Sequence, residues 1–190
     1  MPAALRLDRD RSLLLVVDVQ ERLVPHVAGG DALVARCEAL IEGAAAFGIP
    51  KALTEHCPGQ IGPVIPRLRA RFAEGEIFVK TRFGATDHPE FAAKLPAGRD
   101  QVVVAGIEAH VCVMQTVLGL VAAGRQVFLV EDAVGSRGAR GEDRRLATER
   151  MRAAGCILAG TETVLFEWTR AGDDAGFRST LALVKALPQG

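Results

Sequence analysis

The stretch LLLVVD, residues 13–18, is a continuous apolar run that ends on a carboxylate. Such a run is typical of a strand buried on both faces of a parallel sheet, because these strands show no alternation of apolar and polar residues. Outward from it, short apolar runs alternate with longer stretches rich in Ala, Leu and Arg, which is the pattern of βαβ units. We expect strands at residues 13–17, 49–54, 76–80, 101–107, 126–130 and 155–160.

Helices are expected between and after these strands. Asp31 is a candidate cap for the first helix and Gly48 is placed to end it. Further helices are expected at about residues 110–123, 142–154, 163–169 and 173–187. Right-handed crossovers then predict an α/β fold in which residues 1–190 form a single domain. It has three αβα layers around a Rossmann-like, doubly wound sheet of about six mostly parallel strands in the order 3-2-1-4-5-6.

Composition narrows the classes of function. Lys and Arg together number 23 and so do Asp and Glu, so the chain has no net charge with which to hold a polyanion. We therefore expect no binding to nucleic acid or to a membrane surface. The apolar runs fall far short of the about 20 residues that span a bilayer. Residues 1–12 are charged and lack a signal sequence, which predicts a cytoplasmic protein.

Metal and cofactor motifs are absent from the sequence. The cysteines show no CxxC pair, and the histidines show neither HxH nor HExxH spacing. Neither GxGxxG nor GxxxxGK follows the first strand, which argues against a nucleotide-binding or redox module on the same fold. We expect no metal and no cofactor. An arginine-rich run from Arg137 to Arg145 resembles an anion-binding patch, but Glu142 and Asp143 interrupt it, so a solvated helix start is the preferred interpretation.

Three chemically distinct side chains stand at the carboxyl ends of predicted strands, where doubly wound sheets bind their ligands. Asp18 ends the first strand, Lys80 ends the third, and Cys112 follows the fourth in the first turn of a helix. A helix start and a nearby lysine favour a thiolate, and Asp18 is placed to take the thiol proton. The structural alternatives are a turn-capping Asp18, a solvated Lys80 and an inert, buried Cys112.

The motifs around these residues resemble those of the isochorismatase-like cysteine hydrolases, and in particular the isochorismatase-domain-containing branch. They are LVVDVQ at residues 15–20, VKTRF at 79–83 and AGIEAHVCV at 105–113, and the resemblance covers nearly the whole chain. It implies that Cys112 is the nucleophile, Asp18 the general acid/base and Lys80 the electrostatic partner of the thiol. It also implies a cis peptide between Ile107 and Glu108, with the amides of Glu108 and Cys112 forming an oxyanion hole.

Two departures from the motifs of the family narrow the class of substrate. The Asp-x-His pattern of zinc-binding nicotinamidases is missing, and true isochorismatases lack a cysteine at the position of Cys112. We therefore expect a hydrolase of a small amide, carbamoyl or related acyl compound that works through a thioester. Gln20, Phe83 and His110 are candidate residues of the substrate pocket. The expected partners are the small-molecule substrate and further copies of the chain; the rival interpretation is a catalytically idle oligomeric scaffold.

Overall fold

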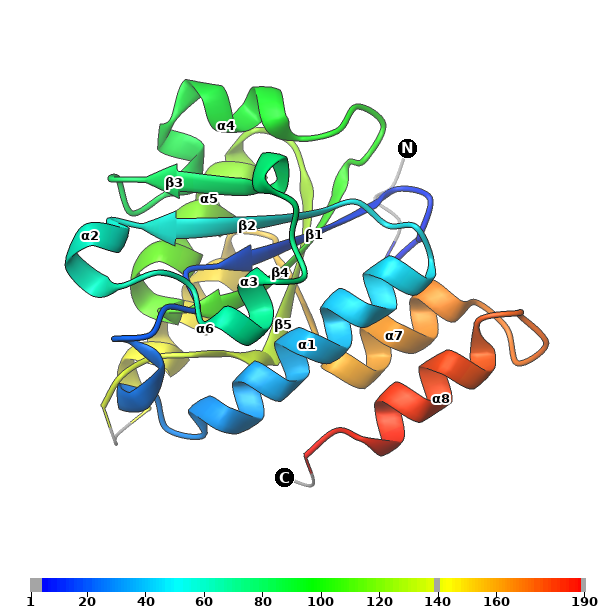
Figure 1. The fold of residues 1–190 in the computed structure, drawn as a ribbon. Helices are drawn as coiled ribbons and strands as arrows, with labels where there is room; N and C mark the ends of the chain where they lie inside the picture. Colours follow the sequence, from blue (N-terminus) through cyan, green and yellow to red (C-terminus); the bar gives the residue numbers. More distant parts are fainter. Residues whose placement is uncertain (1–4, 139–140, 189–190) are drawn as a thin grey trace.

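The computed structural model describes residues 5–138 and 141–188. Residues 1–4, 139–140 and 189–190 of the predicted domain lie outside the described residues. The described residues form one sheet with every strand pair parallel, in the predicted order β3-β2-β1-β4-β5-β6 (Figure 1). The strands are β1 (Ser12–Val17), β2 (Lys51–His56), β3 (Ile77–Lys80), β4 (Gln101–Ile107), β5 (Gln126–Gly135) and β6 (Ile157–Ala159).

Helices cover both faces of the sheet and complete the three layers. On one face lie α1 (Gly30–Ala46), α3 (Pro66–Arg69), α7 (Thr161–Thr169) and α8 (Phe177–Lys185). On the other lie α4 (Pro89–Lys94), α5 (Met114–Ala122) and α6 (Glu142–Ala153). The remaining elements are α2 (Pro58–Ile61), the 3₁₀ turns η1 (Val24–His26), η2 (Glu74–Glu76) and η3 (Ala85–Asp87), and the π turn η4 (Ala109–Val113).

The apolar run of β1 contributes to both cores. Leu14 and Val16 pack toward α1, whereas Leu13, Leu15 and Val17 pack toward α5 on the opposite face. All five side chains are at most 1% exposed. Burying a side chain of this size contributes about 1.5–3 kcal/mol, so a strand without alternation is stable only between two layers of helices.

Two expectations about individual elements are wrong. The fifth strand continues past Val130 to Gly135, because after a register shift Val134 and Gly135 pair with Gly106 and Ile107 of β4. Asp31 does not cap α1: the cap position is held by Gly29, at φ +70°, and Asp31 lies inside the first turn without a capping hydrogen bond. The Asp31 carboxylate still stabilises α1, because it lies near the positive end of the helix dipole.

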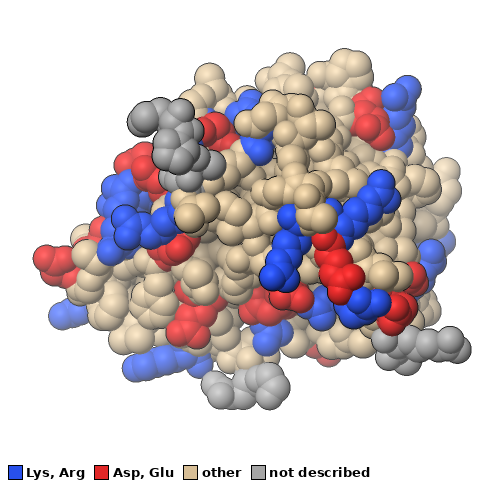
Figure 2. All heavy atoms as spheres, turned by 180° about the vertical axis from the view of Figure 1, so that it is seen from behind, with Lys and Arg blue, Asp and Glu red and all other residues tan. Residues whose placement is uncertain are grey.

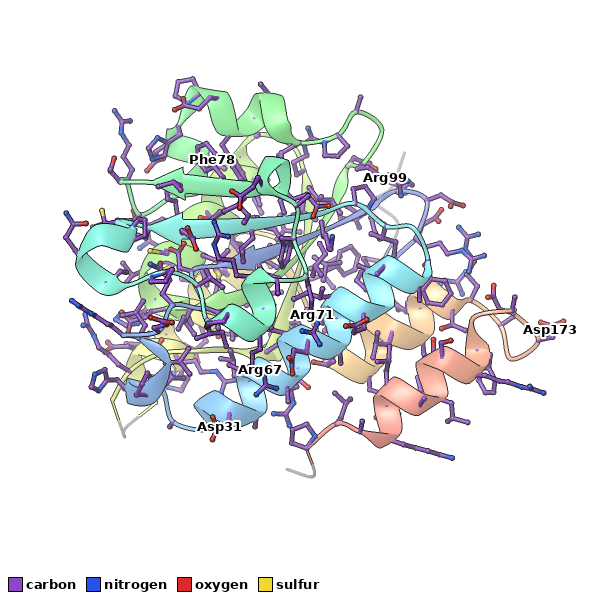
Figure 3. The ribbon with its side chains drawn as sticks, in the orientation of Figure 1. Asp31, Arg67, Arg71, Phe78, Arg99 and Asp173 are labelled. Atoms are coloured by element: carbon purple, nitrogen blue, oxygen red, sulfur yellow. The ribbon has the colours of Figure 1, made fainter. Side chains whose placement is uncertain are left out.

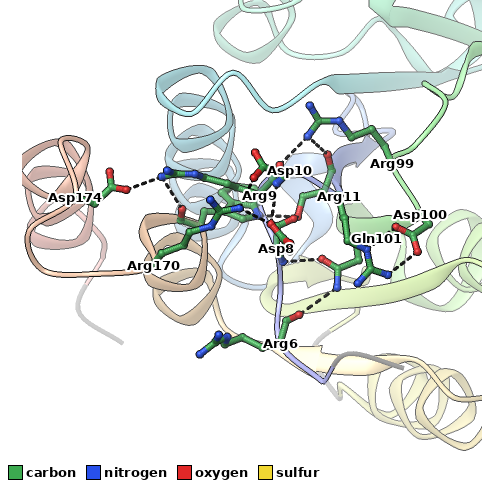
Figure 4. Close-up of polar contacts among 12 residues, drawn as sticks. Arg6, Asp8, Arg9, Asp10, Arg11, Arg99, Asp100, Gln101, Arg170 and Asp174 are labelled. Carbon is green, nitrogen blue, oxygen red and sulfur yellow. Dashed lines mark hydrogen bonds and ion pairs between the residues drawn. The ribbon is translucent and has the colours of Figure 1, made fainter. Parts of the chain in front are cut away.

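Ion pairs attach the peripheral segments. Figure 3 shows Arg67 and Arg71 beside α1, where they pair with Glu38 and Glu42 respectively. At the amino end of the sheet, the segment before β1 is held by a network of charges and amides (Figure 4). There the Asp8 amide donates to Gln101 at 2.7 Å, and the guanidinium of Arg9 pairs with Asp174 at 2.8 Å. These contacts anchor the start of β1 at the edge opposite to Asp18.

The surface mixes both signs of charge. On the face turned away in Figure 1, basic and acidic side chains are interspersed (Figure 2). Within the described residues, no helix is long and apolar enough to cross a membrane.

We predict that Gly106→Ala lowers the free energy of unfolding by at least about 3 kcal/mol. Gly106 has φ +125°, and a Cβ there would lie 2.0 Å from the backbone oxygen of Val17, which cannot move without breaking the pairing of β1 with β4. Urea unfolding measures the loss. Gly59→Ala is the control, because a Cβ at Gly59 meets nothing within 4 Å; equal stability of the two variants would refute the close contact.

Candidate active site

The three predicted residues come together at the carboxyl edge of the sheet. The ammonium of Lys80 reaches past the end of β2 to Asp18, with 2.7 Å between Nζ and Oδ2, and both side chains are fully buried. The buried Cys112 thiol is close enough to both groups that the Asp18 carboxylate raises its pKa and the Lys80 ammonium lowers it. A carboxylate, an ammonium and a thiol therefore form one cluster contributed by three separate chain segments.

Backbone carbonyls complete the environment of Lys80. Its Nζ also donates to the carbonyl of Phe83 at 2.9 Å and to that of Arg82 at 3.4 Å. A buried ammonium is tolerated only when it is paired and hydrogen-bonded, and here it has both a counter-charge and neutral acceptors. The loop after β3 thus fixes the cation in front of Asp18.

Asp18 adopts an unusual backbone conformation and has a partner that the sequence did not single out. Its φ is +50°, in the left-handed region that non-glycine residues seldom occupy. The Thr54 hydroxyl donates to Asp18 Oδ1 at 2.7 Å, and the Thr54 carbonyl accepts from the Asp18 amide at 3.1 Å. Thr54 is fully buried. Thr54 lies inside β2, opposite Val17, and the available sequence signal was a polar threonine at the end of the predicted second strand, residues 49–54.

The expectation that Cys112 rests as a thiolate is wrong. Burial and then the Asp18 carboxylate raise the pKa of Cys112, Lys80 lowers it, and together they leave the pKa raised to about 12. Only 6% of the residue is exposed, so the sulfur loses most of the hydration that a thiolate needs. Lys80 cannot outweigh this because its charge is already balanced by Asp18. The thiol is therefore protonated at neutral pH.

The turn between β4 and α5 has the expected backbone feature, since the Ile107–Glu108 peptide is cis. The Glu108 carbonyl accepts from the amides of Val111 and Val113, at 3.0 and 3.1 Å. Its carboxylate is also engaged, by the backbone amide of Arg137 at 3.0 Å. Arg137 therefore holds one carboxylate oxygen of Glu108, and the Glu108 carbonyl is used in the backbone of the turn.

The three candidate pocket residues differ in position. Gln20 is fully buried, and its amide is consumed by the backbone: Nε2 donates to the carbonyls of His56 and Gly62, and Oε1 accepts from the His56 amide. The expectation that Gln20 contacts substrate is therefore corrected, because this side chain ties the loop after β1 to the loop after β2. Phe83 is 49% exposed beside the cluster, and His110 is half-buried with Nδ1 2.9 Å from Ser136 Oγ.

His56 lies at the same edge of the sheet. Its ring is 5.0 Å from that of Phe83, centre to centre, and its Nδ1 is buried without a hydrogen-bond partner. Burial and then the nearby Lys80 lower the pKa of His56, so the ring is neutral at pH 7. Among the described residues, no group of three His, Cys, Asp or Glu side chains is arranged to hold a metal ion. The absence of a metal stays a prediction.

The fold defines a class, the proteins built on a doubly wound parallel sheet, and the cluster lies where such sheets bind their ligands. The family model for the isochorismatase domain matches residues 12–163. Isochorismatase domain-containing protein 2 of Danio rerio is 32% identical over 180 residues, which cover 94% of this chain and 89% of that protein. Isochorismatase domain-containing protein 2A of Mus musculus is 31% identical over 179 residues, 93% and 84% of the two chains. The chain belongs to the isochorismatase family and is a hydrolase.

Solved structures agree with this assignment. A structure described as the MAR1 ribonuclease of Caenorhabditis elegans is 32% identical with a TM-score of 0.89, covering 97% of this chain and 95% of that one. The YcaC protein of Pseudomonas aeruginosa, described with covalent acrylamide, is 30% identical with a TM-score of 0.86, covering 94% and 91%. The YcaC product of Escherichia coli, described as an octameric hydrolase of unknown specificity, is 28% identical with a TM-score of 0.85, covering 98% and 91%.

We predict that Lys80→Met destabilises the protein by about 3–5 kcal/mol, because it leaves the Asp18 carboxylate buried without a counter-charge. The measurement is chemical unfolding at pH 7. The double variant Asp18→Asn with Lys80→Met removes both charges and should recover most of the loss. If the single variant unfolds at the same denaturant concentration as the unaltered protein, the pair is not the buried ion pair described.

Proposed function

We propose that the protein is a cysteine-dependent hydrolase of a small amide, carbamoyl or related acyl compound, acting as a single domain without metal or cofactor. The observation that carries the proposal is the buried ion pair of Asp18 and Lys80, whose two charges act on the buried Cys112 thiol at the same edge of the sheet. A nucleophile, a proton acceptor and a fixed positive charge in one place suit nucleophilic acyl transfer. Membership of a hydrolase family supports the same chemistry.

The first half-reaction forms a thioester. Asp18 accepts the thiol proton as the sulfur of Cys112 attacks the carbonyl carbon, so that a C–S bond forms and the carbonyl electrons move onto oxygen. The amides of Glu108 and Cys112 donate to this oxyanion. When the intermediate collapses, the C–N bond breaks and protonated Asp18 returns the proton to the departing nitrogen.

The second half-reaction releases the acid. Asp18 removes a proton from a water molecule, the resulting hydroxide attacks the thioester carbon, and the C–S bond breaks. The proton on Asp18 then goes to the departing sulfur, which restores the thiol. Lys80 keeps its charge throughout, and the Thr54 hydroxyl holds the orientation of the carboxylate.

This route accounts for a protonated resting thiol. A thiol whose pKa lies far above neutral is a poor free nucleophile, but in this proposal the Asp18 carboxylate serves as its base. The proton therefore leaves the sulfur together with attack on a bound carbonyl group. A cluster of this kind limits side reactions with electrophiles that do not occupy the site.

The residues around the proposed site are mixed in character. Phe83 and the neutral ring of His56 form an apolar wall on the side of β3, and His110 lies on the side of β5. The Pseudomonas relative described with covalent acrylamide holds a compound that is itself a small amide. RNA is not the proposed substrate, although one relative is described as a ribonuclease, because this chain carries no net positive charge.

Assembly and location complete the proposal. We propose a cytoplasmic homo-oligomer, in keeping with the relative described as an octamer. Light scattering measures the oligomeric state of this protein. The alternative is an idle scaffold that keeps the fold but not the reaction. The intact set of Asp18, Lys80 and Cys112 favours the enzyme, because a scaffold gains little from burying an ion pair against a thiol.

The proposal is tested with a panel of small primary amides, carbamates and esters. We predict release of ammonia or alcohol by the unaltered protein, and an acyl adduct on Cys112 detected by mass spectrometry after acid quenching. Cys112→Ala should lower turnover at least about a thousandfold, since no other nucleophile replaces the sulfur. Cys37→Ala is the control, because this buried thiol lies away from the site, under β5.

Two results would contradict the proposal. One is turnover that survives Cys112→Ala, which would assign the reaction to another group. The other is the absence of both turnover and adduct across the panel, which would favour the idle scaffold.

A further inference from the structure

The loop between β3 and α4 supplies the neutral acceptors of the buried ammonium. Lys80 Nζ donates to the carbonyl of Phe83 at 2.9 Å and to that of Arg82 at 3.4 Å. Residues 81–83 are exposed, so burial contributes little to holding their backbone in place. The positions of the two carbonyls therefore depend on how this exposed half of the loop is tied to the rest of the protein.

The second half of the loop, residues 84–88, is packed against α5. The Ala85 amide donates to the Thr116 hydroxyl of that helix at 3.0 Å. Gly119 of α5 lies so close to Thr86 that a Cβ at Gly119 would be 2.0 Å from the Thr86 hydroxyl oxygen. These contacts leave this half of the loop little room to move, so it forms a fixed base for the exposed half.

His88 joins the two halves of the loop. Its Nε2 accepts a hydrogen bond from the backbone amide of Arg82 at 3.2 Å, and its own amide donates to the Ala85 carbonyl at 3.2 Å. The ring also makes a T-shaped contact with Phe78 of β3, with 5.5 Å between the ring centres. The His88 side chain is only 14% exposed. A mostly buried imidazole therefore connects the fixed base to the residue whose carbonyl faces Lys80.

The hydrogen bond from Arg82 requires a neutral ring. An imidazole nitrogen accepts a hydrogen bond only while it carries no proton, and an imidazolium ion donates at both nitrogens. Histidine is the side chain that changes its charge between pH 5 and 8. A proton gained at Nε2 of His88 turns the acceptor of the Arg82 amide into a second donor that faces it. The two halves of the loop are then no longer joined at this point.

The charges around the ring are few. Among the described side chains, the charged groups of the elements that pack around it are those of Lys80, Arg82, Asp87 and Glu90. Glu90 Oε1 lies 3.9 Å from Nδ1, and the Arg82 guanidinium is turned to the Asp87 carbonyl at 2.9 Å. α5 contributes none, because its residues 114–122 include no charged side chain. The Arg82 amide is therefore the contact of the ring that protonation reverses.

We propose that His88 is a positioning residue of the hydrolase: as a neutral ring it holds the carbonyls that accept from Lys80, and as a charged ring it releases them. The proposal rests on the proposed function, because Lys80 acts on the Cys112 thiol through Asp18. With the carbonyls in place, the ammonium is shared between them and the carboxylate. Without them it acts on the carboxylate alone, which makes Asp18 a weaker base for the thiol proton.

The test measures the rate at which iodoacetamide alkylates Cys112, followed by mass spectrometry of the peptide that carries it. The sulfur attacks the methylene carbon, a C–S bond forms, iodide leaves and the thiol proton passes to the base. His88→Gln places an amide oxygen near the position of Nε2 and does not titrate, whereas His88→Leu has no acceptor. Each variant is compared with the unaltered protein at the same pH, so the titration of every other group cancels in the ratio of the two rates.

At about pH 8 we expect His88→Leu to react about fivefold to tenfold more slowly than the unaltered protein, and His88→Gln to recover most of that loss, because it restores the hydrogen bond. At about pH 5 the unaltered protein loses the same contact. The ratio for His88→Leu should then rise to about one, and that for His88→Gln should rise severalfold. His26→Gln removes an exposed histidine of η1 and should leave the ratio unchanged at both pH values.

Three results would overturn the proposal. They are an unchanged rate in His88→Leu at the higher pH, an equal deficit at both pH values, which would make His88 a packing residue only, and a His88→Gln variant as slow as His88→Leu.

A second measurement uses the unaltered protein and does not depend on any variant folding. Hydrogen exchange of the Arg82 amide, corrected for its intrinsic rate, should lose protection as the pH falls from about 8 to about 5. Constant protection over this range would contradict the release of the loop. Neither measurement needs turnover. A pH-dependent result in a protein that hydrolyses nothing would therefore leave the role of His88 standing and refute only the proposed function.

Discussion

The ion pair between Asp18 and Lys80 is the constraint on which the site depends. Two opposite charges lie 2.7 Å apart with no exposure to solvent, so each must be held where the other can neutralise it. This requirement fixes the end of β1 relative to the end of β3, across the intervening β2. The Thr54 hydroxyl and the Phe83 carbonyl complete the hydrogen bonds of the two groups. The conformations of the loops at this edge therefore depend on the ion pair as well as on apolar packing.

The same burial sets the chemistry of the thiol. A sulfur enclosed with a carboxylate keeps its proton, since desolvation and the Asp18 charge both raise the pKa of Cys112. The positive charge of Lys80 lowers this pKa, but its first partner is Asp18. The site is therefore built for transfer of a proton at the moment of attack rather than for storage of a thiolate. In the proposed reaction, substrate binding supplies the carbonyl carbon that makes this transfer productive.

Sequence patterns predicted the parts of the structure that depend on local rules. The alternation of short apolar runs with helical stretches located all six strands, and the strand-end rule for parallel sheets placed Asp18, Lys80 and Cys112 at one edge. The errors arose where tertiary contacts decide. The helix start before Cys112 suggested a thiolate, but desolvation of the sulfur outweighs the helix dipole. Gln20 was expected to contact substrate, but its side chain hydrogen-bonds to the backbone of the loop after β2. Arg137 belonged to an interrupted charge run, and its tether to Glu108 joins residues 29 positions apart.

The state of the Cys112 proton tests the account most directly. The ultraviolet absorbance of thiolate, taken as the difference between the unaltered protein and Cys112→Ser, can be followed from about pH 6 to pH 10. Because the pKa of Cys112 is raised from 9.0 to about 12, the account predicts no thiolate signal from this residue near neutral pH and none until well above pH 9. A titration midpoint at or below about pH 7, as in activated cysteines, would contradict it. Cys112 would then rest as a stored thiolate, and Asp18 would not be the group that receives its proton.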